Sequence, residues 1–236
     1  MKAVILAGGE GTRLAPYTTV FPKPMLPLGK KPILEILIRQ LSYYGFKDII
    51  LSVGYLSEII HAYFYNNRML KDVNLEYVKE HEPLGTAGSL SLIKGLNETF
   101  LVINGDILTT LDYRKLIKFH KRNRSMLTIA AHKRDVKIDY GVMYGDAKGR
   151  LRKYDEKPTL NYLVSMGIYI FEPEVLAYIA LNKKLDFPDL VKKLLVKGEK
   201  VLIYPNTDYW LDIGRHDDYK EAVEIFEKKQ RMFLKL

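Results

Sequence analysis

The chain of 236 residues has no cysteine, one tryptophan and only two glutamines. The absence of cysteine excludes thiolate catalysis, iron–sulfur clusters and cysteine-ligated zinc sites. A chain of this length has no need of such cross-links, because it can bury roughly 70% of the surface that its unfolded form exposes. We therefore expect a self-sufficient hydrophobic core and a reducing compartment.

Long hydrophobic runs are also absent. No segment approaches the roughly 20 apolar residues of a membrane-spanning helix, and the apolar run at residues 3–7 is too short for a signal peptide and ends in glycines. We expect a cytoplasmic protein without a membrane partner. The net charge of +9 is typical of a solvated, lysine-rich surface, and it would also attract anionic ligands. The chain has no aromatic-interleaved RNA motif and no zinc-finger spacing. We therefore expect no nucleic-acid partner.

The first half of the chain alternates strand and helix patterns. Short apolar runs predict strands at Lys2–Ala7, Lys47–Val53, Val73–Val78 and Phe100–Ile103. Helical spacing of apolar residues predicts helices at Pro32–Tyr44, Ser57–Tyr65, Thr86–Leu96 and Tyr113–Asn123. We place Pro32 in the first turn of its helix and Gly45 at its C-terminal cap. This βαβ alternation predicts a doubly wound α/β sheet that binds ligands at the carboxyl ends of its strands.

The pattern becomes rich in strands from Met126 onward. We predict strands at Leu127–His132, Tyr140–Tyr144, Leu151–Tyr154, Leu163–Phe171 and Lys200–Tyr204, and helices at Pro173–Ala180, Phe187–Val196 and from His216 to about Phe233. This part is a β-rich segment inserted into, or appended to, the α/β core. With no linker, repeat or low-complexity tract, we expect one domain over residues 1–236 with a mixed central sheet.

A glycine-rich loop, Leu6–Leu14, follows the first strand. Its glycines let the backbone approach a polyanion and direct N–H groups toward it, and Arg13 adds a cation suited to phosphate. No Walker A string, Gly-x4-Gly-Lys-Ser/Thr, occurs. The Rossmann fingerprint also fails, because Leu14 stands where its last small residue is required and Pro16 prevents a clean helix start. The loop predicts a nucleotide site that is neither a P-loop nor a dehydrogenase site.

This loop, followed by the segment Phe21-Pro22-Lys23-Pro24-Met25-Leu26-Pro27, resembles the N-terminal signature of the sugar-1-phosphate nucleotidylyltransferases, also called nucleoside-diphosphate-sugar pyrophosphorylases. The resemblance runs from Lys2 to Tyr219. It implies a Rossmann-like, doubly wound mixed sheet with a β-rich sugar-binding insertion. It also implies that residues 1–125, approximately, form the nucleotide-binding half and residues 126–236 the half that binds the sugar phosphate.

The resemblance assigns the nucleotide contacts. Arg13 and Lys23 hold the triphosphate and stabilise the departing pyrophosphate. The segment Glu82–Gly88 resembles the base-recognition turn, in which Gly85 lets the base lie against the backbone and Thr86 looks like the cap of the following helix. The implied nucleotide-binding residues are Leu6, Ala7, Gly8, Gly9, Gly11, Thr12, Arg13, Glu82, Gly85 and Thr86.

Two separated aspartates form the implied metal site. Asp106 ends an apolar strand in Asn104-Gly105-Asp106, where alone it would be typical of a turn or a helix cap. By resemblance its partner is Asp212, in Tyr209–Gly214. Two carboxylates, with phosphate oxygens completing the octahedron, are the expected ligands of Mg²⁺. Arg13, Lys23, Asp106 and Asp212 are thus the implied catalytic residues.

The implied sugar-phosphate contacts come from the second half of the chain. Glu156 accepts hydrogen bonds from sugar hydroxyls, Lys157 binds the phosphate, and the backbone of Gly141 lies against the sugar. Ser165 and Gly167 belong to the same half-site. Ser165 departs from the asparagine frequent in guanylyltransferases of mannose-type sugars and resembles the glucose-type adenylyltransferases, so the identity of the sugar stays open.

The implied reaction is Mg²⁺-dependent transfer of a nucleotidyl group from an NTP to a sugar 1-phosphate. Our first choice is GTP with a mannose- or heptose-type sugar, and glucose with UTP or dTTP is the alternative. A molybdopterin nucleotidyltransferase shares the opening loop but not the Glu156–Pro158 and Ser165–Tyr169 segments. A non-catalytic regulatory homologue that binds a nucleotide sugar would lack some of the four catalytic residues.

No hexapeptide repeats or regulatory modules follow these motifs, so we expect a minimal catalytic unit. The sequence leaves open whether copies associate as a homo-oligomer.

Overall fold

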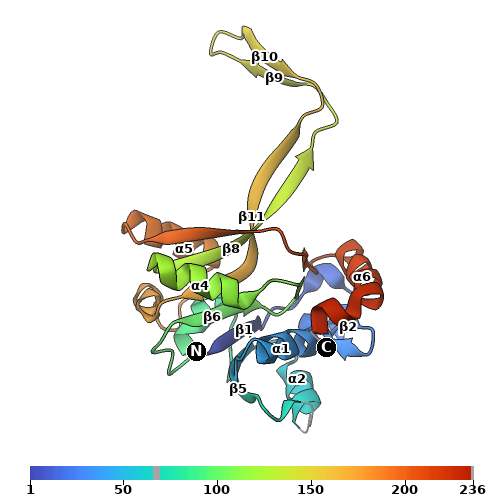
Figure 1. Ribbon diagram of the computed structural model, residues 1–236, viewed down its shortest axis with the longest axis vertical. Helices are drawn as coiled ribbons and strands as arrows, with labels where there is room; N and C mark the ends of the chain where they lie inside the picture. Colours follow the sequence, from blue (N-terminus) through green and yellow to red (C-terminus); the bar gives the residue numbers. More distant parts are fainter. Residues whose placement is uncertain (66–69, 235–236) are drawn as a thin grey trace.

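The computed structural model describes residues 1–65 and 70–234 and is built on a mixed seven-stranded sheet (Figure 1). The strand order is β12-β8-β11-β6-β1-β4-β5. The bounds are β1 Ala3–Ala7, β4 Asp48–Val53, β5 Asn74–Lys79, β6 Phe100–Asn104, β8 Leu127–Lys137, β11 Thr159–Phe171 and β12 Val201–Asn206. This architecture confirms the predicted α/β class with a mixed central sheet.

The sheet has a parallel part and an antiparallel insertion. β5, β4, β1 and β6 are mutually parallel, as the βαβ pattern predicted. β11 is antiparallel to both β6 and β8, and β12 runs parallel to β8. The carboxyl ends of β1 and β6 therefore meet at the same edge, where a ligand site is expected.

Helices cover both faces of the sheet and create two apolar layers. Neighbouring residues of β1 point to opposite faces, so that Ile5 lies in one buried cluster and Val4 in the other. The first layer packs against α1 (Ile33–Tyr43), α2 (Ser57–Phe64), α4 (Tyr113–Asn123) and α6 (His216–Leu234), and the second against α5 (Phe187–Val196). Among the described residues, no helix is both long and apolar enough to cross a membrane.

Three helix predictions need correction. The helix predicted at Thr86–Leu96 is wrong: α3 spans only Gly85–Gly88, and a 3-10 turn, Ser89–Leu92, follows it. The N–H groups of Ala87 and Gly88 bond to the carbonyl of Leu185, so this short helix is held by tertiary contacts. Similarly, Pro173–Tyr178 is a 3-10 helix. Pro32 is the N-cap of α1, one residue before its predicted place.

The β-rich insertion forms a long arm. β8 and β11 run past the strand ends predicted for them and leave the body of the protein as a two-stranded ladder (Figure 1). Beyond them, β9 (Val142–Gly145) and β10 (Leu151–Asp155) pair with each other and with no other described strand. We call residues 132–164 the arm.

Gln40, one of the two glutamines, ties three elements together inside the core. Its side-chain amide donates to the carbonyl of Thr109, 2.8 Å away, and to that of Phe233, 2.9 Å away. We expect Gln40→Leu to lower the free energy of unfolding by about 1–3 kcal/mol, because it strands two buried carbonyl groups. Urea denaturation measures this. Gln230→Leu, at an exposed position on α6, is the matched control, and an equal loss in both variants would contradict the assignment.

Candidate active site

The glycine loop and the Asn104–Asp106 turn lie side by side. Leu6 of β1 is in register with Asn104 of β6, and the N–H of Gly105 donates to the carbonyl of Leu6 over 2.8 Å. Both segments leave the sheet at its carboxyl edge, which confirms the placement predicted from the parallel strands.

Contacts with Thr18 and Lys23 hold the glycine loop in a fixed shape. Gly11 has a φ of 65°, in the left-handed region, and the hydroxyl of Thr18 donates to its carbonyl over 2.9 Å. A Cβ at Gly11 would lie 3.0 Å from the Cβ of Lys23. Gly9 is different, because a Cβ there would meet nothing within 4 Å. Gly11 therefore packs the loop onto the Lys23 segment, while Gly9 faces open space that a ligand can occupy.

Lys23 is buried, with 8% of its surface exposed, and forms an ion pair with Oδ2 of Asp106. It lies in a one-turn 3-10 helix, Lys23–Met25, which the N–H of Met25 closes onto the carbonyl of Pro22. The ring of Pro24 packs against Gly105, where a Cβ would lie 3.1 Å from its Cγ. The prolines thus fix the ammonium group beside Asp106.

A short antiparallel ladder brings Asp212 to the same place. β13 (Trp210–Asp212) pairs with β7 (Ile107–Thr109), so Asp212 stands opposite Ile107, and the N–H of Ile213 donates to the carbonyl of Asp106 over 3.0 Å. Partial burial and the Asp106 carboxylate raise the pKa of Asp212, against the opposing influence of Lys23 and Arg13. The structure therefore unites Arg13, Lys23, Asp106 and Asp212.

The two carboxylates suit a divalent cation. Oδ1 of Asp106 is buried and has no hydrogen-bond partner among the described residues. Within the same residues no group of three or more His, Asp or Glu side chains could hold a metal. Hard oxygen ligands that leave most coordination positions to water or phosphate are what Mg²⁺ prefers. The donor set fits Mg²⁺ held by Asp106 and Asp212, with a bound phosphate supplying further oxygens.

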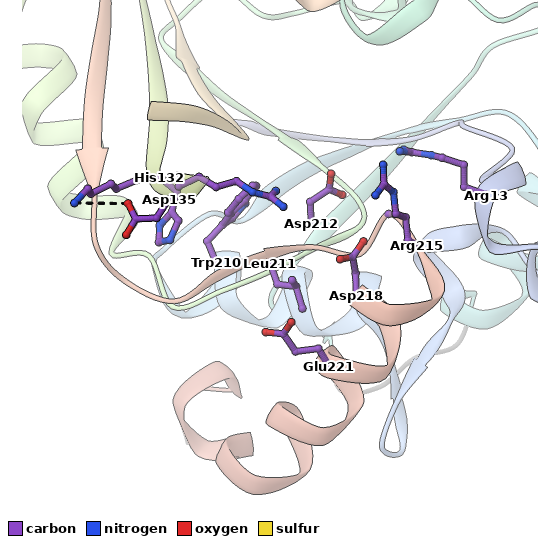
Figure 2. Close-up of a pocket in the computed structure, with 12 residues that line it drawn as sticks. Arg13, His132, Asp135, Trp210, Leu211, Asp212, Arg215, Asp218 and Glu221 are labelled. Atoms are coloured by element: carbon purple, nitrogen blue, oxygen red, sulfur yellow. Dashed lines mark ion pairs between the residues drawn. The ribbon is translucent and has the colours of Figure 1, made fainter. Parts of the chain in front are cut away.

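A pocket of about 470 Å³ lies beside Asp212 (Figure 2). Arg13 and Arg215 line it, and neither guanidinium has an ion-pair partner in the described part of the chain. Sequence reasoning missed Arg215, although it directly follows the quoted Tyr209–Gly214 motif. It also missed His132, Lys133 and Arg134, which lie in the middle of β8, and Trp210, whose indole N–H donates to the carbonyl of Met166 over 2.9 Å. The carboxylates of Asp135, Asp212, Asp218 and Glu221 also line the pocket, so its wall carries charges of both signs.

A second pocket also borders the glycine loop. Gly8, Glu10 and Glu82 line a pocket of about 280 Å³, together with Glu80, another residue that sequence reasoning missed. Oε1 of Glu80 accepts a hydrogen bond from Ser52 and Oε2 one from the N–H of Leu84, and burial raises the pKa of Glu80. Glu82 thus lies beside the glycine loop.

Thr86 caps a different helix from the one predicted. α3 has no side-chain cap, whereas the hydroxyl of Thr86 accepts from the N–H of Phe187 over 2.8 Å at the start of α5. The carboxylate of Asp186 in turn accepts a hydrogen bond from the backbone N–H of Thr86. A Cβ at Gly85 would lie 2.6 Å from Oδ1 of Asp186, so this glycine permits a close approach of two chain segments. Gly85 and Thr86 also line a pocket of about 170 Å³ with Gly8 and Gly9.

The predicted sugar-phosphate residues are divided between two places. Ser165 and Gly167 lie at the base of the arm, where Gly167 has a φ of 69° and a Cβ there would lie 2.6 Å from the amide nitrogen of Asn104. Gly141, Glu156 and Lys157 lie on the arm, in the short segments that join the β8–β11 ladder to the β9–β10 ladder. Lys157 has a φ of 44°, uncommon for a residue other than glycine. The structure does not bring these three residues to Asp106 and Asp212 of the same chain.

We expect Gly11→Ala to lower the free energy of unfolding by about 1–2 kcal/mol, because the left-handed backbone and the contact with Lys23 both resist a Cβ. Gly9→Ala is the matched control in the same loop and should change stability by less than about 0.5 kcal/mol. Chemical denaturation followed by circular dichroism measures both. Equal stability of the two variants would contradict the packing of the loop onto Lys23.

Known proteins resemble this chain over nearly its whole length. A family model described as "Nucleotidyl transferase" matches residues 2–229. The UTP–glucose-1-phosphate uridylyltransferase of Synechocystis sp. is 36% identical over 94% of this chain and 62% of its own length. Mannose-1-phosphate guanylyltransferase 1 of Arabidopsis thaliana is 32% identical over 96% of this chain and 64% of its own length. The chain thus spans less than two thirds of these curated relatives.

Solved structures share the fold over nearly the whole chain. The crystal structure of HddC from Yersinia pseudotuberculosis is 30% identical and has a TM-score of 0.72, covering 95% of this chain and 99% of that one. The same protein complexed with GMP-PN gives a TM-score of 0.71. The predicted fold is therefore confirmed by coordinates as well as by sequence.

Proposed function

Because the chain belongs to the nucleotidyl transferase family, we propose that it transfers the nucleotidyl group of an NTP to a sugar 1-phosphate, giving an NDP-sugar and pyrophosphate. The observation that carries the proposal is the convergence of Lys23, Asp106 and Asp212 on the edge of the sheet that also presents the glycine loop. The arginines of the neighbouring pocket supply cationic groups for a second phosphate.

The reaction is an in-line displacement at the α-phosphorus. An oxygen of the sugar phosphate forms the new P–O bond as the bond to the pyrophosphate oxygen breaks. That oxygen is already largely anionic at neutral pH, so no strong general base is required. The protein accelerates such a step by positioning its substrates and neutralising charge. The backbone at Gly9 receives the triphosphate, and Arg13 and Lys23 stabilise the departing pyrophosphate.

Mg²⁺ held by Asp106 and Asp212 would supply Lewis-acid stabilisation and a template for the phosphates. Lys23 is ion-paired with Asp106, so the lysine and a bound cation would both neutralise this carboxylate. The buried, unpartnered Oδ1 of Asp106 supports the role proposed for it.

We propose GTP as the nucleotide, with a mannose- or heptose-type sugar 1-phosphate. Glu10, Glu80 and Glu82 line the hollow beside the glycine loop. Carboxylates are acceptors, and guanine offers two adjacent donors, its ring N–H and its amino group, where uracil and thymine offer one. The alternative is a uridylyl- or thymidylyltransferase for glucose 1-phosphate, the activity named for the Synechocystis relative.

The test is a grid of NTPs against sugar 1-phosphates with Mg²⁺, read as pyrophosphate release. We expect the highest rate with GTP, and a loss of about 10²–10³-fold in Asp106→Asn, because one charge-stabilising group is removed. Trp210, the only tryptophan, lines the pocket, so its fluorescence reports binding separately from turnover. If no pair of substrates releases pyrophosphate but a nucleotide sugar still quenches the fluorescence of Trp210, a regulatory homologue is favoured.

Lys157 provides a test of the sugar-phosphate half. We expect Lys157→Ala to raise KM for the sugar 1-phosphate about 10–100-fold while KM for the NTP stays within a factor of about two, because one charged hydrogen bond is lost. Lys148→Ala, at the tip of the same arm, is the matched control. Equal effects of both variants on KM would contradict a direct contact. Initial-rate kinetics with each substrate varied in turn give the comparison.

A further inference from the structure

The arm holds Glu156 and Lys157 away from the site of their own chain. β8 and β11 pair residue by residue from Lys137 and Thr159 down to Ala131 and Ser165, and the register shifts only below Ser165. At about 3.3 Å per residue, the six steps from Ser165 to Thr159 span roughly 20 Å. The hydrogen bond from the N–H of Ile138 to the carbonyl of Pro158 extends the ladder further. No lysine side chain reaches back over that distance.

The far end of the arm carries exposed apolar side chains among its charged ones. Tyr140 is 80% exposed, Met143 68% and Tyr154 54%. β9 and β10 form an isolated two-stranded ribbon, and such a ribbon is at best marginally stable in water without a further strand or a packing surface. An exposed apolar group of this kind marks a contact with another surface.

A second cluster of solvent-exposed apolar side chains borders the candidate site. Val20 is 61% exposed, and Tyr17 and Phe21 are each 50% exposed, in the segment between the glycine loop and Lys23. The ring of Tyr17 packs against those of His216 and Tyr219, so this group adjoins the start of α6 and the arginine-lined pocket. We call Tyr17, Val20 and Phe21 the rim.

We propose that the arm of one copy of this chain covers the rim of a second copy, so that Glu156 and Lys157 complete the sugar-phosphate half of the partner's site. The inference rests on the proposed function. Two arms exchanged about a two-fold axis close the assembly as a dimer, since the same surfaces then meet twice. We infer a second copy of the chain as the partner because its binding would bury the apolar side chains of both the arm and the rim. It would also bring Glu156 and Lys157 to each site.

The arrangement makes each active site a product of two chains. Lys23, Asp106 and Asp212 come from the body of one copy, and Glu156 and Lys157 from the arm of the other. A chain that folded its arm back onto its own site would have to break the ladder between β8 and β11, and its site would then be complete in a single copy. The two arrangements therefore differ in which mixtures of inactive variants recover activity.

The experiment co-expresses two differently tagged inactive chains, Asp106→Asn with an intact arm and a double variant, Glu156→Ala with Lys157→Ala, with an intact body. Sequential purification on both tags isolates the mixed dimer. One of its two sites then combines an intact body with an intact arm. We expect about half of the wild-type pyrophosphate release per dimer, far more than either parent variant releases by itself.

An inactive mixed dimer, or failure to isolate any mixed dimer because the wild-type chain is monomeric, would overturn the inference. The double arm variant must also be inactive by itself, and wild-type activity there would overturn it too. Failure of the proposed function is a separate result, since wild-type protein would then be silent in the whole substrate grid.

Sedimentation provides a readout independent of catalysis. We expect the wild-type chain to sediment as a dimer, and the double variant Tyr140→Ser with Met143→Ser to shift toward the monomer and to lose activity on dilution. Leu195→Ser, at an exposed apolar position on α5, is the matched control and should remain dimeric. A fully active dimer of the arm variant at every dilution would contradict the proposed contact.

Discussion

The buried ammonium group of Lys23 is the constraint on which the candidate site depends. A buried charge is costly unless an opposite charge lies beside it. Here Asp106 is its ion-pair partner, and the prolines on either side of Lys23 keep the pair in place. The same packing holds the glycine loop, because Gly11 rests on the stem of Lys23. Loop, lysine and carboxylate therefore form one unit that charge and packing hold together.

The sheet supplies the rest of the geometry. The parallel pairing of β1 with β6 puts Leu6 and Asn104 in register, and the short ladder of β7 with β13 adds Asp212. Backbone hydrogen bonds fix both ladders, so the two carboxylates are held close together before any ligand arrives. Partial burial and the neighbouring Asp106 carboxylate raise the pKa of Asp212, and a cation held by the two carboxylates would relieve their repulsion. Preorganised charge of this kind suits phosphoryl chemistry.

The arm connects the site to assembly. Its base belongs to the central sheet, where Gly167 packs against Asn104, and its far end carries exposed aromatic residues. The residues proposed to bind the nucleotide thus lie on the body of the protein, whereas Glu156 and Lys157, proposed for the sugar phosphate, lie on the arm. An exchange of arms would join them and bury apolar surface at the same time.

The sequence by itself determined the fold class and the nucleotide edge. Hydrophobic periodicity located β1, α1 and β6, and the parallel arrangement that it implied put the glycine loop beside Asp106. These features depend on short stretches of chain, and local patterns report them reliably. The sequence also excluded a Walker A loop, because it has no Gly-x4-Gly-Lys-Ser/Thr string, and a Rossmann loop, because Leu14 and Pro16 follow the glycines.

Only the tertiary structure decided how distant segments meet. No spacing could pair Asp106 with Asp212, because the ladder of β7 with β13 closes over about 100 residues; the resemblance supplied that pair. The cap formed by Thr86 at α5 and the entry of Arg215 into the pocket also depend on long-range packing. The sequence also could not predict the direction of the arm. A strand has the same alternating pattern of side chains whether it packs on the body of the protein or projects from it.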